Sequence, residues 1–80
     1  MEVILTNKAQ KDLEKLDHLI KKRIIQKIEN FETGKSVDIS GLGKNLFKIR
    51  IGDYRIIIKK QEEKYYVLRV GHRKNIYKEF

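Results

Sequence analysis

The stretch LFKIRIGDYRIIIK, residues 46–59, constrains the fold of this chain more than any other. Apolar residues alternate with polar ones on both sides of Gly52-Asp53, a pair typical of a two-residue β-hairpin turn. With these two residues as the turn, one face of the hairpin carries Phe47, Ile49, Ile51, Tyr54, Ile56 and Ile58. We therefore predict two antiparallel strands whose apolar face belongs to the protein core.

The other face of this hairpin gathers positive charge. It carries Lys48, Arg50 and Arg55, which we call the cationic face, and the register sets Arg50 directly opposite Arg55. Like charges that face each other across strands destabilise a sheet by up to about 1 kcal/mol per pair, and the pattern places no acid among them. Guanidinium groups suit phosphate oxygens, and a bound polyanion would relieve the repulsion. We interpret the cationic face as a phosphate-binding surface.

Two helices are expected before the hairpin. Residues 2–6 are typical of a short strand, and Thr6 or Asn7 can cap the helix that follows. Apolar residues then recur at helical spacing on both sides of a break near Asp17-His18. The first helix has Ala9, Leu13 and Leu16 on one face, and the second has Ile20, Ile24, Ile28 and Phe31. Two helices joined this tightly form an antiparallel hairpin.

The remaining strands define the fold class. We expect strands over residues 45–51, 54–60 and 64–71, a loop over 33–43 and a turn over 61–63. The order predicts a single α+β domain over residues 1–80, with an N-terminal strand and a helix hairpin packed on one face of a mostly antiparallel four-stranded sheet.

The length of the second turn decides which side chains of the last strand face the core. A three-residue turn sets Arg55 opposite Arg69 and Tyr54 opposite Val70, and an even-numbered turn reverses the faces. We prefer the three-residue turn because it buries Leu68 and Val70. In that register Arg69 joins the cationic face, and the residues assigned to the core are Tyr66, Leu68 and Val70.

Composition limits the class of protein. The net charge is +8, and residues 41–80 hold 11 basic and 4 acidic residues against 8 and 7 in residues 1–40. This asymmetry favours a polyanionic partner, with nucleic acid ahead of a membrane surface. No apolar run approaches the roughly 18 residues that span a bilayer, and the chain has no cysteine. We expect a cytoplasmic protein without disulfides.

Motifs for metals and cofactors are absent from the sequence. The only histidines are His18 and His72, and there is no phosphate-binding glycine loop and no Ser/His/Asp arrangement. Asp38 and Asp53 lie in expected loops and are interpreted as turn residues. We therefore predict no cofactor and no metal site.

A second cluster of functional residue types follows Gly71. The segment GHRKNIY contains His72, Arg73, Lys74 and Tyr77. An aromatic ring beside cations is what single-stranded RNA recognition uses, because the ring stacks on an unpaired base while the cations hold the backbone. The alternative for Tyr77 is a hydrophobic plug at the end of the sheet.

The two motifs together, FKIRIGDYRII at residues 47–57 and YVLRVGHRKNIY at residues 66–77, resemble the RelE toxins of the RelE/ParE superfamily of type II toxin–antitoxin systems. The resemblance implies a microbial-ribonuclease-like fold and an endoribonuclease that cuts mRNA in the ribosomal A site and so inhibits translation under stress. It also implies a small, acidic, RelB-like antitoxin as partner, in a toxin–antitoxin hetero-oligomer with no membrane involved.

The resemblance also implies site residues. In the family the substrate's own 2′-hydroxyl attacks the adjacent phosphate without a metal, and the matching positions here are Lys48, Arg50, Arg55, Arg73 and Tyr77. Lys48 is then the expected general base, because neighbouring positive charges disfavour its protonated form. Arg55 and Arg73 would stabilise the phosphate, and Tyr77 would stack on a base. Arg50 stands where the best-known members have lysine, and it is a poor proton carrier.

Other roles and other functions stay open. Further RNA contacts are expected from Arg69, His72 and Lys74, and His72 is either an acid or base or a packing residue. A ParE-like toxin that inhibits DNA gyrase on the same scaffold is the nearest alternative function. A non-catalytic RNA-binding module is the third.

Overall fold

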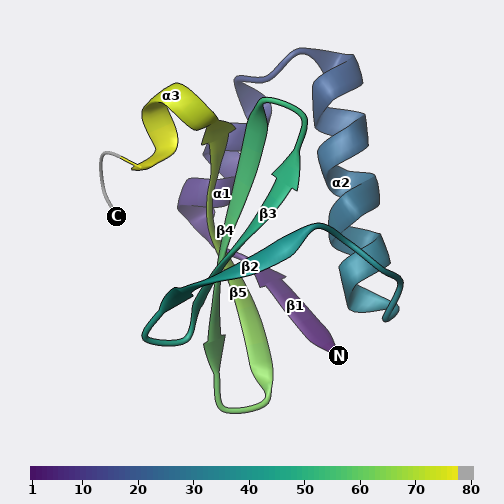
Figure 1. Ribbon diagram of the computed structural model, residues 1–80. Helices are drawn as coiled ribbons and strands as arrows, with labels where there is room; N and C mark the ends of the chain where they lie inside the picture. Colours follow the sequence, from purple (N-terminus) through teal and green to yellow (C-terminus); the bar gives the residue numbers. More distant parts are fainter. Residues whose placement is uncertain (78–80) are drawn as a thin grey trace.

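A computed structural model describes residues 1–77 and arranges them as one sheet with helices on both sides (Figure 1). The elements in chain order are β1 (Glu2–Leu5), α1 (Asn7–Glu14), α2 (His18–Glu32), β2 (Ile39–Gly43), β3 (Leu46–Ile51), β4 (Tyr54–Gln61), β5 (Lys64–His72) and α3 (Arg73–Ile76). Across the sheet the strand order is β1-β5-β4-β3-β2; β1 runs parallel to β5 and the other neighbours are antiparallel. The predicted α+β class is confirmed.

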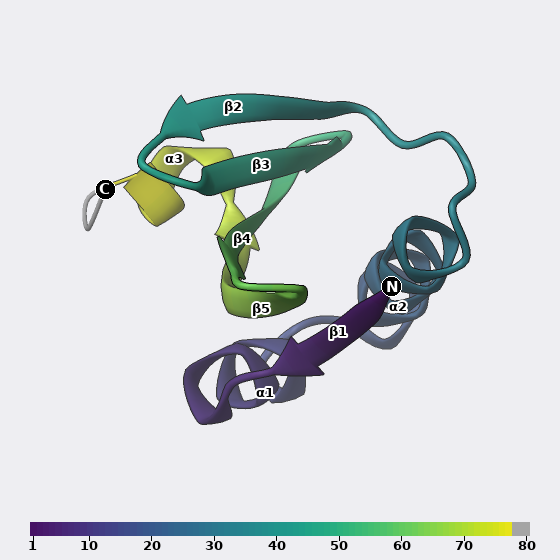
Figure 2. The same cartoon turned by 90° about the horizontal axis from the view of Figure 1, so that it is seen from below.

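The prediction of four strands with a loop over residues 33–43 is wrong, because β2 is a fifth strand. All five of its residues are exposed, so its sequence shows no alternation of buried and exposed side chains. Main-chain pairing with β3 defines the strand, with an irregularity between Gly41 and Gly43. Figure 2 shows β2 and β3 curling away from α1 and α2, on the side where α3 lies.

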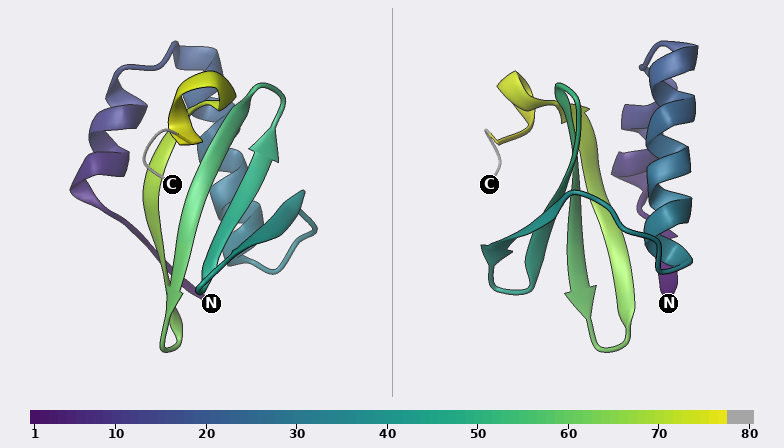
Figure 3. Two further views of the ribbon diagram at one scale, coloured as in Figure 1. Left: turned by 60° about the vertical axis from the view of Figure 1, so that its left-hand side comes forward. Right: turned by 45° about the vertical axis from the view of Figure 1, so that its right-hand side comes forward.

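The predicted helix pair covers one face of the sheet, and α3 lies on the other face (Figure 3). Thr6 caps α1 by accepting the Ala9 N–H, and Asp17 caps α2 by accepting the Leu19 N–H. The core between these layers consists of Ala9, Leu13, Ile24, Ile28, Phe31, Ile49, Ile51, Ile56, Ile58, Val67 and Val70. Within residues 1–77 no helix is long and apolar enough to cross a membrane.

The β3–β4 hairpin has the predicted register. Gly52 and Asp53 form the turn, and Arg50 lies opposite Arg55. Gly52 has a φ of +56°, a conformation that favours glycine. Ile49, Ile51, Ile56 and Ile58 therefore belong to the core beneath the helices, and the cationic face lies on the opposite side of the sheet together with Ile57.

The predicted register of β4 and β5 is wrong. The turn has two residues, Glu62 and Glu63, and further along Arg55 lies opposite Gly71 while Tyr54 lies opposite His72. A β-bulge after Val67 adds one residue to β5. Its consequence is that Val67 and Val70, three positions apart, are both buried. Tyr65 packs against this core with Val67, whereas the predicted core residues Tyr66 and Leu68 are only half-buried.

The side chain that caps α1 and a side chain from its second half bind the edge of β5 beyond β1. The Thr6 hydroxyl donates to the Val67 carbonyl at 2.8 Å. The Asp12 carboxylate accepts the Val70 N–H at 2.9 Å and two bonds from the Arg69 guanidinium, at 2.8 and 3.1 Å. Thr6 and Asp12 therefore satisfy main-chain groups at the bulge that no strand reaches.

This environment changes the pKa of the Asp12 carboxyl. Burial raises its pKa, but hydrogen bonds from Arg69 and the Val70 amide, together with the charges of Arg69 and Lys15, outweigh burial and hold the pKa below its ordinary value. A lowered carboxyl pKa stabilises the folded state above the pKa of the unfolded chain, and this stabilisation is lost as the pH falls through the folded pKa.

Asp12→Asn tests this arrangement. We expect the substitution to lower the free energy of unfolding at pH 7 by about 1–3 kcal/mol, because a partly buried arginine loses its counter-charge. The difference from the unsubstituted protein should shrink as the pH falls below about 4, the ordinary carboxyl pKa, and should be lost once the pH is below the lowered pKa of folded Asp12. Urea denaturation at both pH values measures this. Asp17→Asn, a change at an exposed cap that asparagine fills equally well, is the control; an equal loss at both pH values would contradict the prediction.

Candidate active site

The outer face of the sheet has a small apolar patch beside the cationic face. Ile57 and Ile76 are buried there, outside the main core. Ile76 of α3 lies against Gly71, where an added Cβ would come within 3.7 Å of its Cδ1. At this distance an added Cβ would make only an ordinary contact, so Ile76 packs directly over β5 at Gly71. Figure 3 shows α3 and the β2–β3 turn projecting from this same side of the sheet.

Lys48 and Tyr77 are brought together across this face. Lys48 is half-buried in the middle of β3, opposite Ile57 of β4. Its Nζ lies 5.6 Å from the centroid of the Tyr77 ring, within the range of a cation–π contact. Tyr77 follows α3 and remains 36% exposed, so its ring is accessible to a ligand. This exposure does not fit the alternative of a buried hydrophobic plug.

Arg50 is paired with an acid that the sequence analysis treated as a turn residue. Its Nε and Nη2 lie 2.8 and 2.7 Å from Oδ2 of Asp38. Both side chains are more than half exposed. The expectation that no acid lies among the cations is therefore wrong, because the segment before β2 brings Asp38 alongside β3.

Arg55 is held by the hairpin turn. Its Nη1 donates to the carbonyls of Gly52, at 2.7 Å, and Tyr54, at 2.9 Å. These bonds direct the guanidinium toward the turn and away from Arg50, its cross-strand partner. The remaining N–H groups of the guanidinium are the ones that a phosphate can use.

Arg73 lies beside the same turn. Its main-chain N–H donates to the Asp53 carbonyl at 2.8 Å, and its Nε lies 3.6 Å from the Asp53 carboxylate. The side chains are 55% and 65% exposed. Asp53 is thus a second acid that lies beside a cation although it was interpreted only as a turn residue. A Gly-Asp turn has the same sequence pattern with or without a contact to an arginine.

The three further candidates have different surroundings. His72 caps α3, its Nδ1 accepting the Lys74 N–H at 3.2 Å, and its ring lies edge-on to Tyr54 with centroids 5.4 Å apart. Lys74 is exposed. Arg69 does not face Arg55 as predicted, because the bulge places it opposite Ile57 and its guanidinium pairs with Asp12. A role for these residues in RNA binding stays a prediction.

The arrangement suits an anionic, single-stranded ligand. The Lys48 amine and the Tyr77 ring lie together over the middle of β3, and Arg55 and Arg73 contact the β3–β4 turn. Amine and guanidinium groups can bind phosphate, and an exposed ring can stack on a base. Among residues 1–77 no group of three His, Cys, Asp or Glu side chains could hold a metal ion.

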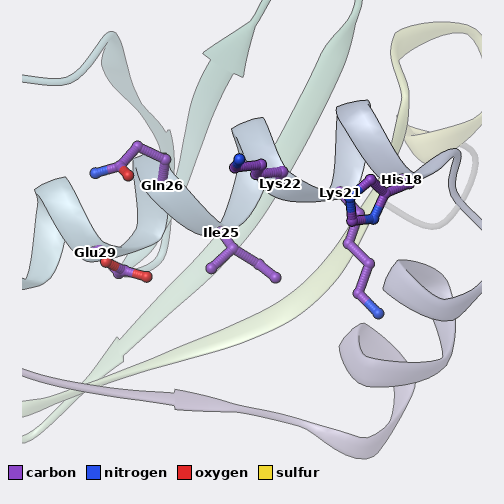
Figure 4. A pocket seen from close by; sticks show the side chains of 6 residues that line it. All are labelled: His18, Lys21, Lys22, Ile25, Gln26 and Glu29. Atoms are coloured by element: carbon purple, nitrogen blue, oxygen red, sulfur yellow. The ribbon is translucent and has the colours of Figure 1, made fainter.

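A separate pocket lies on the helical side of the molecule. Its volume is about 340 Å³, and it is lined by α2 residues His18, Lys21, Lys22, Ile25, Gln26 and Glu29 (Figure 4). It contains none of the sequence-predicted site residues. We place the candidate site on the outer face because the groups suited to phosphate chemistry converge there.

Comparisons with known proteins identify the family. Residues 3–77 match the model of the ParE toxin of type II toxin–antitoxin systems. A chain in the crystal structure of the RelB–RelE antitoxin–toxin complex from Methanococcus jannaschii is 32% identical, with a TM-score of 0.80, over 96% of this chain and 98% of that chain. No curated protein matches the sequence.

More distant structures share the fold. The isolated RelE toxin of E. coli has a TM-score of 0.70 at 22% identity, over 98% of this chain and 92% of that chain. A chain of the RelBE2 complex from Mycobacterium tuberculosis has the same TM-score at 24% identity, over 89% and 95%. The family model and the Methanococcus jannaschii relative agree with the two sequence motifs: the chain belongs to the ParE toxin family and is a RelE-type toxin of the RelE/ParE superfamily of type II toxin–antitoxin systems.

Proposed function

We propose that the protein is a ribosome-dependent endoribonuclease that cleaves mRNA in the ribosomal A site in the cytoplasm. The observation that carries the proposal is the position of the Lys48 amine 5.6 Å from the exposed Tyr77 ring, on a face that also presents Arg50, Arg55 and Arg73. An inhibitor that acts by binding alone does not require this combination. The 32% identical chain from a RelB–RelE complex supports the same class.

The reaction needs no nucleophile from the protein. Lys48, as the neutral amine, takes the proton of the substrate 2′-hydroxyl, and the resulting oxyanion attacks the adjacent phosphorus. The bond to the 5′-oxygen breaks, and that oxygen takes up a proton from water, leaving a 2′,3′-cyclic phosphate and a 5′-hydroxyl. Lys48 is well placed for its role, because a half-buried residue in the centre of β3 holds its amine more firmly than a loop residue would.

The arginines stabilise the charge that develops on the phosphoryl group. Arg50 and Arg55 approach it from β3 and β4, and Arg73 approaches from the start of α3. Tyr77 stacks on a base and holds the nucleotide in line for attack. Arg73 also lies where it can assist the leaving oxygen, but since guanidinium stays protonated it does so by charge rather than by proton transfer.

Inhibition of DNA gyrase is the second candidate function. The match of residues 3–77 to the ParE toxin model favours it. Gyrase inhibition predicts the same fold but assigns no chemistry to Lys48 or Tyr77. The two candidates therefore differ in what induction of the protein damages: transcripts or DNA.

We also propose a small, acidic, RelB-like antitoxin as partner. The charge of +8 and its concentration in residues 41–80 favour an acidic chain. The similar chains in RelB–RelE and RelBE2 complexes support this kind of hetero-oligomer.

Induction of the protein in bacterial cells should stop growth and cut translated messages within codons. Primer extension on a defined mRNA measures this, and Arg73→Ala, which loses a phosphate contact, should leave the message intact. Intact transcripts together with accumulating DNA breaks would contradict the ribonuclease proposal and support the gyrase one.

Substitution of Lys48 separates base catalysis from simple charge. Lys48→Ala and Lys48→Arg should each slow A-site cleavage by roughly 100-fold or more, because arginine keeps the charge but cannot accept a proton. Single-turnover cleavage on programmed ribosomes measures the rate, and circular dichroism checks the fold. If Lys48→Arg cleaves as fast as the unsubstituted protein, Lys48 is not the base. If Lys48→Ala also cleaves as fast, Lys48 takes no part in cleavage, and if none of the three proteins cleaves, the protein binds RNA without catalysis.

Affinity purification of the tagged protein from its native host should recover one small acidic partner. The complex should weaken as salt is raised, since its attraction is largely between opposite charges. Recovery of no acidic partner at low salt would contradict the proposed pairing.

A further inference from the structure

Two acidic residues lie within the candidate site, and each contacts one arginine through both its main chain and its carboxylate. We propose that Asp38 and Asp53 are positioning residues that aim Arg50 and Arg73 at the substrate phosphate. The identity of that substrate rests on the proposed ribonuclease function, but the positioning itself is a property of the free protein.

Asp38 fixes Arg50 through both its main chain and its side chain. The Asp38 carbonyl accepts the Arg50 N–H at 2.9 Å, and its carboxylate binds Nε and Nη2 of the guanidinium at 2.8 and 2.7 Å. The first contact sets where the residue sits along β3, and the second sets where its guanidinium points. One edge of the guanidinium is used, and the N–H groups of Nη1 remain for a phosphate.

Asp53 contacts Arg73 in a similar but looser way, with a main-chain hydrogen bond and a longer ion pair in place of the short side-chain contacts. The Asp53 carbonyl accepts the Arg73 N–H at 2.8 Å, and the carboxylate lies 3.6 Å from Nε. The neighbouring pair of rings, Tyr54 and His72, adds a further contact between the same two segments. The β3–β4 turn is thereby joined to the start of α3, the segment that leads to Tyr77.

Stability does not explain these acids. The four side chains are 53–65% exposed, and exposed ion pairs contribute little to the free energy of unfolding. Each carboxylate also reduces the positive charge that attracts a polyanion. Their benefit is therefore orientation, because an arginine that is already directed loses less freedom when the transition state forms.

Asp38→Asn and Asp53→Asn test the proposal. Asparagine keeps the size of the side chain and the turn-forming tendency but removes the charge. Glu63→Gln makes the same charge change in the β4–β5 turn, at the end of the sheet opposite the β3–β4 turn, and is the control (Figure 1). On programmed ribosomes we expect each Asp→Asn variant to lower kcat on the order of tenfold without raising KM, and the control to leave both unchanged.

A second measurement needs no catalysis. In the isolated protein, heteronuclear NOEs of the Arg50 and Arg73 Nε–H groups report side-chain order. We expect Asp38→Asn to lower the value for Arg50 only, Asp53→Asn that for Arg73 only, and Glu63→Gln neither.

The outcomes separate this proposal from the proposed function. Tighter ribosome binding with unchanged kcat would mean that the carboxylates merely occupy the phosphate positions, and would overturn the proposal. Unchanged Nε–H order in both variants would overturn it as well. A protein that cleaves no mRNA refutes the ribonuclease function, while the NOE measurement still decides whether the two aspartates orient the arginines.

Discussion

The free edge of β5 depends on two side chains, the Thr6 hydroxyl and above all the Asp12 carboxylate. β1 ends at Leu5, and the bulge in β5 lies just beyond that point. Asp12 binds the Val70 amide and the Arg69 guanidinium there, so the irregular part of the strand has its partners. Because unpaired main-chain groups in a partly buried edge are costly, the bulge is tolerated only with such a contact. The bulge in turn sets where β5 ends and α3 begins, and so the position of Arg73 and Tyr77.

The parts of the fold that were predicted correctly have strong local signals. The β3–β4 hairpin follows from alternation around Gly52-Asp53, and the helix pair follows from apolar spacing and the caps at Thr6 and Asp17. The register of β5 could not be predicted in this way. Regular alternation cannot bury both Val67 and Val70, and a bulge leaves no mark in the pattern. β2 was missed because a fully exposed strand has no pattern to detect.

The candidate site, like the fold, was predicted only in part. The predicted meeting of the hairpin with the segment after Gly71 is present, as the contact between Lys48 and Tyr77 shows. The repulsion expected between Arg50 and Arg55 is smaller than a bare pair of cations would give, because Arg50 binds Asp38 and Arg55 turns to main-chain carbonyls. The contact between Arg50 and Asp38 could not be predicted, since an aspartate in a turn has the same sequence signature whether or not it reaches a distant arginine. The contacts of Arg55 with main-chain carbonyls have no sequence signature either.

The candidate site is assembled from segments that are made at different times during synthesis. A growing chain that has completed only β4 already contains Lys48, Arg50 and Arg55, but the ring of Tyr77 and the guanidinium of Arg73 arrive only with α3 and the residue after it. The hydrogen bond from the Arg73 N–H to the Asp53 carbonyl joins this last segment to the β3–β4 turn. A protein of this kind therefore lacks its complete candidate site until all of residues 1–77 have been translated.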